Sequence, residues 1–100
     1  MTFDDYKASL KKDIPPEGLS PLLLAMWHDG KNDWDGSHNI AQDIHSSDGS
    51  WIHAYLHRKE GDSGNAAYWY MKAGKKTPVL SLEDEWEEIV KTFLSFDSKL

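Results

Sequence analysis

Residues 51–73 read WIHAYLHRKEGDSGNAAYWYMKA, and this stretch decides the fold. The spacing of its apolar residues predicts one helix over about 50–60 and a second over 63–73. Between them, Gly61 can take the left-handed conformation that ends a helix, and Asp62 can cap the next helix with its carboxylate. Because so short a break makes neighbouring helices run antiparallel, we expect a tight helical hairpin over residues 50–74.

The same combination of a turn residue and an aspartate cap occurs once more, earlier in the chain. Ser20-Pro21 is a typical helix start, and Asn32-Asp33 repeats the break, so helices are expected over 21–31 and about 34–46. Together they form a first hairpin over residues 20–46. A shift of 29 residues between the two hairpins aligns three identical pairs: Ala25 with Ala54, His28 with His57 and Asp33 with Asp62.

The second hairpin resembles a tetratricopeptide repeat. The positions that carry the likeness are Ala54, Ala66, Tyr70, Ala73 and Pro78, with Gly61-Asp62 at the turn. Alanines let two helices approach closely, and a proline ends the second helix. Taken over about residues 20–78, the resemblance implies two stacked hairpins and suggests a groove for a peptide.

The chain also resembles a group of small uncharacterised bacterial and fungal proteins. The group has no known activity, so this resemblance supports a helical fold and a site near these residues but implies no chemistry. The phrases that carry it are Trp27-His28-Asp29, Asp33-Trp34-Asp35, His38, residues 51–62 (WIHAYLHRKEGD) and residues 65–70 (NAAYWY).

Two further helices are expected to flank the hairpins. Thr2 and Asp5 favour a first helix over 3–12, and an apolar stripe from Leu82 to Leu94 predicts a capping helix within 81–97. No segment shows the alternation of a strand. We therefore predict a single all-α domain over residues 1–100, with about six helices and more than half of its residues helical. The acidic residues of the last helix are expected to face solvent: Glu83, Asp84, Glu85, Glu87 and Glu88.

Composition bounds the function. The chain has 100 residues, a formal net charge of −6 and no cysteine. The negative charge argues against binding to nucleic acid or to an anionic membrane surface, and no apolar run is long enough to span a bilayer. The absence of cysteine excludes disulfides, thiolate metal sites and cysteine nucleophiles. With no leader-like start, the expectation is a cytoplasmic protein.

One candidate site lies on the first helix of the second hairpin. Trp51, Tyr55 and Arg58 are spaced to share a face, and the repeat offset places Asp29 beside Arg58. With Trp27 and His28 they form a proposed ligand-binding lip, because arginine binds carboxylate or phosphate and aromatic rings stack. This interpretation predicts a small binding or adaptor module without a cofactor, whose partner is a peptide or a small anionic molecule. The alternative is core packing around an Asp29–Arg58 ion pair.

Histidines offer the second candidate. His53, His57 and Glu60 share another face of the same helix, and His38 and His45 lie two turns apart on the preceding helix. Imidazole and carboxylate groups bind zinc or nickel, so His38, His53, His57 and Glu60 are a possible metal site. The alternative is a set of satisfied interior histidines.

Two smaller features leave alternatives open. Acid–base catalysis by histidines, with His28 beside Asp29 or Asp33, is the enzymatic interpretation, and the sequence does not decide whether any reaction occurs. Lysines at the end of the helix 63–73 are interpreted as compensating its dipole, with an anion-binding patch as the alternative: Lys72, Lys75 and Lys76.

Overall fold

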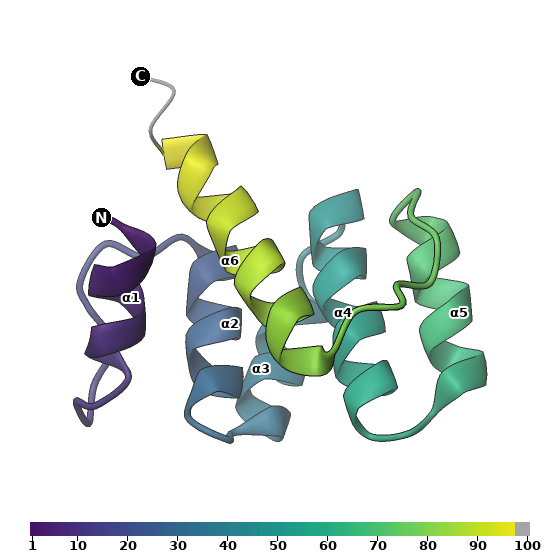
Figure 1. Ribbon diagram of the computed structural model, residues 1–100, viewed down its shortest axis with the longest axis horizontal. Coiled ribbons are helices and arrows are strands. Elements are labelled where there is room, and N and C mark those ends of the chain that lie inside the picture. The colour runs from purple at the N-terminus through teal and green to yellow at the C-terminus, as the bar shows by residue number, and fades with distance from the viewer. Residues whose placement is uncertain (98–100) are drawn as a thin grey trace.

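The computed structural model describes residues 1–97, and within that range it contains six helices and no strand (Figure 1). These residues are 66% helical, which confirms the all-α prediction. None of the helices described is long and apolar enough to cross a membrane. Their bounds are α1 Phe3–Ser9, α2 Pro21–Gly30, α3 Trp34–Ala41, α4 Ser47–Lys59, α5 Ser63–Lys72 and α6 Leu82–Asp97.

The two expected helix pairs, α2 with α3 and α4 with α5, are the most extensively packed neighbours. Both turns use the anticipated residues. Asn32 and Gly61 have positive φ values of 62° and 88°, and each is followed by an aspartate N-cap. Asp33 accepts from the Gly36 N–H at 3.0 Å, and Asp62 accepts from the Asn65 N–H at 3.2 Å. One left-handed residue and one cap are therefore enough to reverse the chain.

The link between the pairs differs from expectation. The helix expected over 34–46 ends at Ala41, and the helix expected over 50–60 begins at Ser47, with Ser46 as its N-cap. The Ser46 hydroxyl accepts from the Gly49 N–H at 3.2 Å. A Cβ on Gly49 would lie 2.2 Å from the Ile44 carbonyl oxygen, so only glycine lets the link fold this closely over α4. The first helix is also shorter than expected and ends at Ser9.

Helix α6 does not extend the row of hairpins; it lies across α2 and α4 (Figure 1). Its inward face buries Trp86, Ile89, Val90 and Phe93, and Phe3 and Tyr6 of α1 pack against Trp86. The Trp86 indole N–H donates to the Met26 carbonyl oxygen at 3.3 Å. The face of α2 and α4 on which the sequence suggested a groove is therefore covered by the chain's own last helix.

Glu85 corrects the expectation that the acidic residues of α6 face solvent. It is 1% exposed, although its neighbours Glu83 and Asp84 are exposed as predicted. The reason is helical geometry. Glu85 lies one turn before Ile89, on the side that packs against α4, and donors on α4 and α5 satisfy its carboxylate.

Candidate functional site

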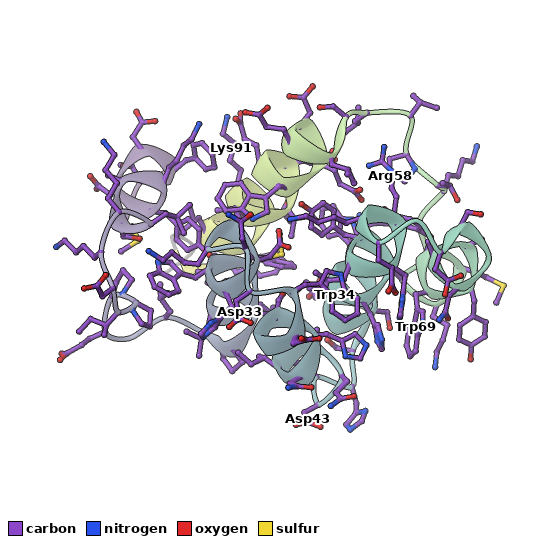
Figure 2. All side chains as sticks on the ribbon, turned by 90° about the horizontal axis from the view of Figure 1, so that it is seen from below. Asp33, Trp34, Asp43, Arg58, Trp69 and Lys91 are labelled. Atoms are coloured by element: carbon purple, nitrogen blue, oxygen red, sulfur yellow. The ribbon has the colours of Figure 1, made fainter. Side chains whose placement is uncertain are left out.

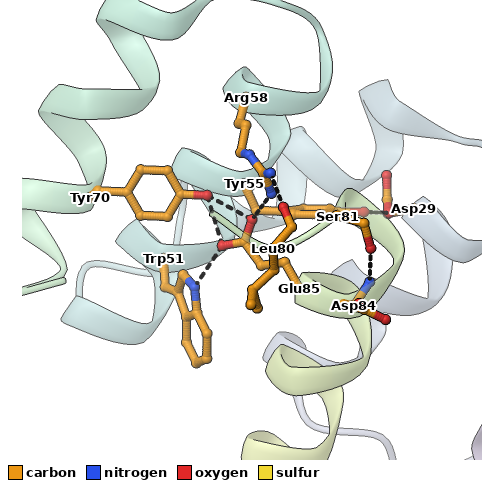
Figure 3. Close-up of polar contacts among 9 residues, drawn as sticks. All are labelled: Asp29, Trp51, Tyr55, Arg58, Tyr70, Leu80, Ser81, Asp84 and Glu85. Atoms are coloured by element: carbon orange, nitrogen blue, oxygen red, sulfur yellow. Dashed lines mark hydrogen bonds and ion pairs between the residues drawn. The ribbon is translucent and has the colours of Figure 1, made fainter. Parts of the chain in front are cut away.

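Two residues of the proposed lip on α4, Trp51 and Arg58, bind a buried carboxylate (Figure 3). Glu85 accepts hydrogen bonds from the Trp51 indole at 3.2 Å, from the Arg58 guanidinium at 2.8 Å and from the Tyr70 hydroxyl at 2.7 and 2.8 Å. Burial, and then this hydrogen bonding, raise the pKa of Tyr70 above its usual range, so the hydroxyl stays a donor. These four side chains form an internal polar network beneath α6.

The expected Asp29–Arg58 ion pair is wrong. Asp29, which is 2% exposed, accepts from the Lys59 ammonium at 3.0 Å and from the Tyr55 hydroxyl at 3.2 Å. Arg58 pairs with Glu85 and donates a second bond to the Leu80 carbonyl oxygen. The 29-residue offset between the hairpins predicts that Asp29 lies near the turn of α4 that carries Arg58. It gives no information about α6, which supplies the Glu85 carboxylate that Arg58 binds.

The other two members of the lip point elsewhere. Trp27 is 2% exposed, and its indole donates to the Ser9 hydroxyl at 3.1 Å. His28 has a ring nitrogen 3.2 Å from the carboxylate of Asp33, the N-cap of α3. The six residues of the predicted lip are therefore divided between the core, the Glu85 network and a helix cap.

The histidines, by contrast, converge. His38 on α3 and His53 and His57 on α4 each place a ring nitrogen within 4.8 Å of those of the other two. The Nε2 atoms of His38 and His53 are 2.9 Å apart. His38 is half-buried, and His53 and His57 are each 8% exposed. We call these three side chains the histidine cluster.

Aromatic rings hold two of the imidazoles in place. Trp34 stacks on His38 with ring centroids 4.9 Å apart, and Trp69 stacks on His53 at 4.0 Å. The Trp34 indole also donates to the Leu56 carbonyl oxygen at 2.8 Å, which fixes its ring against α4. In the view of Figure 2, Trp34 and Trp69 lie below Arg58.

The fourth residue predicted for the metal site, Glu60, lies behind the cluster. Its carboxylate is 2.5 Å from Nδ1 of His57. A carboxylate in this position fixes the tautomer of an imidazole and directs its other nitrogen toward a metal, the usual arrangement behind metal-bound histidines. Glu60 therefore supports the cluster by orienting His57.

Electrostatics keep two members of the cluster neutral. Burial lowers the pKa of His38, with a further contribution from His57. Burial, the neighbouring His38 and His57, and the Lys72 ammonium lower the pKa of His53 to about 4. At neutral pH these imidazoles are unprotonated, which is the form that binds metal ions.

Sequence reasoning had paired His45 with His38, and the structure separates them. Because α3 ends at Ala41, His45 is exposed in the link and is not part of the histidine cluster. The reasoning also missed Trp34 and Trp69 as supports. Trp69 follows His53 by sixteen positions and faces α4 across the hairpin. Its contact with His53 could be predicted only by someone who knew which residues of the two helices lie opposite each other.

Comparison of the chain with protein-family models, with curated proteins and with solved structures finds no match. The function proposed below therefore rests on the geometry of the histidine cluster.

Proposed function

We propose that this protein binds one divalent transition-metal ion, zinc or nickel, through His38, His53 and His57. The observation that carries the proposal is the convergence of three imidazoles from two helices, one of them backed by the Glu60 carboxylate. Buried histidines in ordinary cores bond to a carbonyl, a hydroxyl or a carboxylate, whereas His38 and His53 direct Nε2 atoms at each other. The covered face of α2 and α4 gives no comparable support to a peptide-binding groove.

The spacing of the cluster suits a small ion. Two nitrogens of a tetrahedral zinc site, each about 2.0–2.1 Å from the metal, are roughly 3.3 Å apart. The Nε2 atoms of His38 and His53 lie at 2.9 Å, so they need to separate by only a few tenths of an ångström. Three protein ligands leave one coordination position open, which is typical of catalytic and ligand-exchanging zinc sites.

The bound ion would join the two hairpins. His38 belongs to α3 and the other two ligands to α4, so coordination adds a cross-link between helix pairs that otherwise meet through packing and a few hydrogen bonds. Because the unfolded chain does not preform this site, metal binding should stabilise the fold by about 2.7 kcal/mol when free metal is a hundredfold above the dissociation constant. Stabilisation therefore gives a readout that does not depend on any activity.

The experiment is calorimetric titration of untagged protein with zinc chloride and nickel chloride, followed by thermal unfolding. One equivalent should bind, and His38→Ala, which removes a ligand, should weaken binding by at least the roughly ten- to hundredfold that loss of a partner behind a ligand costs. His45→Ala is the matched control, since His45 lies in the adjacent link and outside the cluster. Absence of stoichiometric binding, or an equal loss in both variants, would overturn the proposal. A tetrahedral absorption spectrum with cobalt(II) would support it directly.

A further inference from the structure

A cavity of about 300 Å³ opens at the amino end of α4. The link 42–46 forms one wall, the first turns of α4 form the floor, and Trp69 and Lys72 of α5 form the opposite wall. His53 of the histidine cluster also lines it. This volume reaches the lower end of the range found for small-molecule sites.

The charge of the cavity differs from that of the chain. The sequence carries seventeen acidic residues against eleven lysines and arginines, yet none of the residues that line the cavity is an aspartate or a glutamate. Lys72 is the one lining residue with a formal charge at neutral pH. Its ammonium lies 4.9 Å from the centre of the Trp69 ring, which keeps it at the cavity wall. The cavity lining thus holds one lysine and no carboxylate, although Asp43 and Asp48 are chain neighbours of lining residues.

Hydroxyl donors face this cation across the cavity. Ser50 is 8% exposed and lines the cavity, and within residues 1–97 its hydroxyl makes no hydrogen bond to another group of the protein. Ser47 and Gln42 add a hydroxyl and an amide at the rim. The close approach that Gly49 permits brings the link over these groups and makes the recess. A hydroxyl that makes no hydrogen bond within the protein has donor and acceptor capacity left for a ligand in the cavity.

We infer that this cavity binds a small oxyanion, a phosphate or a carboxylate, with Lys72 supplying the charge and Ser50 a hydrogen bond. Because His53 belongs both to the cavity lining and to the histidine cluster, the anion would lie close to the metal ion. That second part rests on the proposed function, whereas the anion site itself stands on the cavity alone. The remaining volume accommodates an organic group attached to the anion.

The test is titration of ¹⁵N-labelled, metal-free protein with methylphosphonate and, separately, with acetate, followed by two-dimensional NMR. We expect saturable shifts of the amides of residues 46–50 and of Trp69 and Lys72 with at least one of the two anions. The anion that binds more tightly identifies the phosphate or the carboxylate source. Acetamide, the neutral analogue of acetate, should produce no saturable shift.

Two lysine variants separate this site from general attraction of anions. Lys72→Met should weaken anion binding about tenfold or more, as expected for loss of a charge-assisted hydrogen bond. Lys76→Met removes the same charge four residues away, outside the cavity, and should leave the affinity unchanged. Equal affinities in the wild type and Lys72→Met, or equal losses in the two variants, would overturn the inference.

A second titration with protein loaded with one equivalent of zinc tests the coupling. The anion should then bind at least several-fold more tightly, because a divalent cation lies next to its site. If zinc does not bind, the proposed function fails while the metal-free titration still decides the anion site. If zinc binds but the anion affinity is unchanged, the anion site stands and its contact with the metal is refuted.

Discussion

Replacing Glu85 by glutamine is the sharpest test of the network beneath α6. The substitution keeps the size and shape of the side chain and removes its charge. In the structure one carboxylate oxygen accepts from Arg58 at 2.8 Å and the other from Trp51 at 3.2 Å, while the Tyr70 hydroxyl reaches both. Glutamine has only one acceptor oxygen, so its amide nitrogen must face either the guanidinium or the indole N–H.

The magnitude follows from this geometry. With the amide oxygen toward Arg58, the indole N–H of Trp51, a residue only 4% exposed, loses its acceptor, which costs about 1–3 kcal/mol. The interaction with Arg58 also weakens, because an ion pair is replaced by a hydrogen bond to a neutral amide. Since the Arg58 side chain is 23% exposed, water offsets part of that loss. The expected total is about 3 kcal/mol, near the lower end for a broken buried pair.

The assay is urea unfolding at pH 7, monitored by circular dichroism, with a thermal melt alongside. For a chain of this size, about 3 kcal/mol corresponds to a fall in Tm of roughly 12–24 °C. Glu88→Gln is the matched control, because Glu88 lies on the same helix, has the same charge and is exposed. A Glu85→Gln protein within about 0.5 kcal/mol of the control would refute the reasoning, since the carboxylate would then not be what satisfies the buried donors.

Three more predictions test the fold and the histidine cluster. Ala66 is 2% exposed on the α5 face toward α4, so Ala66→Leu should overpack the hairpin and lower the free energy of unfolding by about 1–3 kcal/mol, measured by urea unfolding. Gly49→Ala forces a Cβ against the Ile44 carbonyl and should destabilise by a similar ~1–3 kcal/mol, whereas Gly64→Ala, with open space at the Cβ position, should stabilise by about 0.5–1 kcal/mol; equal effects would contradict the close approach. His53 has a folded-state pKa of about 4, set by burial, His38, His57 and Lys72, against about 6.5 in the unfolded chain. Between these values the unfolded chain takes up a proton that folded His53 does not, so the metal-free protein should lose up to about 3 kcal/mol of stability as pH falls from 6.5 to 4, and the loss should shrink in His53→Asn but persist in His45→Asn.

The hairpins could be predicted because their signals are local. A left-handed residue, an aspartate cap and small residues at the crossing act within a few positions, and both turns formed as expected. The apolar stripe likewise predicted α6 as a packed helix. What it packs against could not be derived, because the period of a helix reports which face is buried and not which surface covers it.

The contacts of the site depend on that missing information. Glu85 belongs to an acidic run that favours a solvated helix start, and only its place against α4 turns it into the acceptor for Arg58. The prediction that α3 extends to residue 46 is wrong for a different reason. Residues 42–45 contain neither proline nor glycine, and the features that place the boundary, the Ser46 cap and the contact of Gly49 with Ile44, come after them in the chain. This boundary also decided that His45 would not join the histidine cluster.

Helix α4 carries two sets of side chains with the same spacing, and the two sets face different parts of the structure. Trp51, Tyr55 and Arg58 face the buried carboxylates of Glu85 and Asp29 and form hydrogen bonds with them. A structural role therefore accounts for these three residues. His53, His57 and Glu60 face the other way, toward α3 and α5, where the three imidazoles of the histidine cluster meet.

Nine consecutive residues of α4, from Gly49 to His57, are buried, so an apolar side chain at position 53 would serve the core better than an imidazole. Keeping His53 there costs stability at every pH below its unfolded pKa. Buried titratable groups with strongly shifted pKa values concentrate at functional sites because function is what repays that cost. On these grounds we propose the histidine cluster, and not the aromatic and arginine face, as the functional site of this protein.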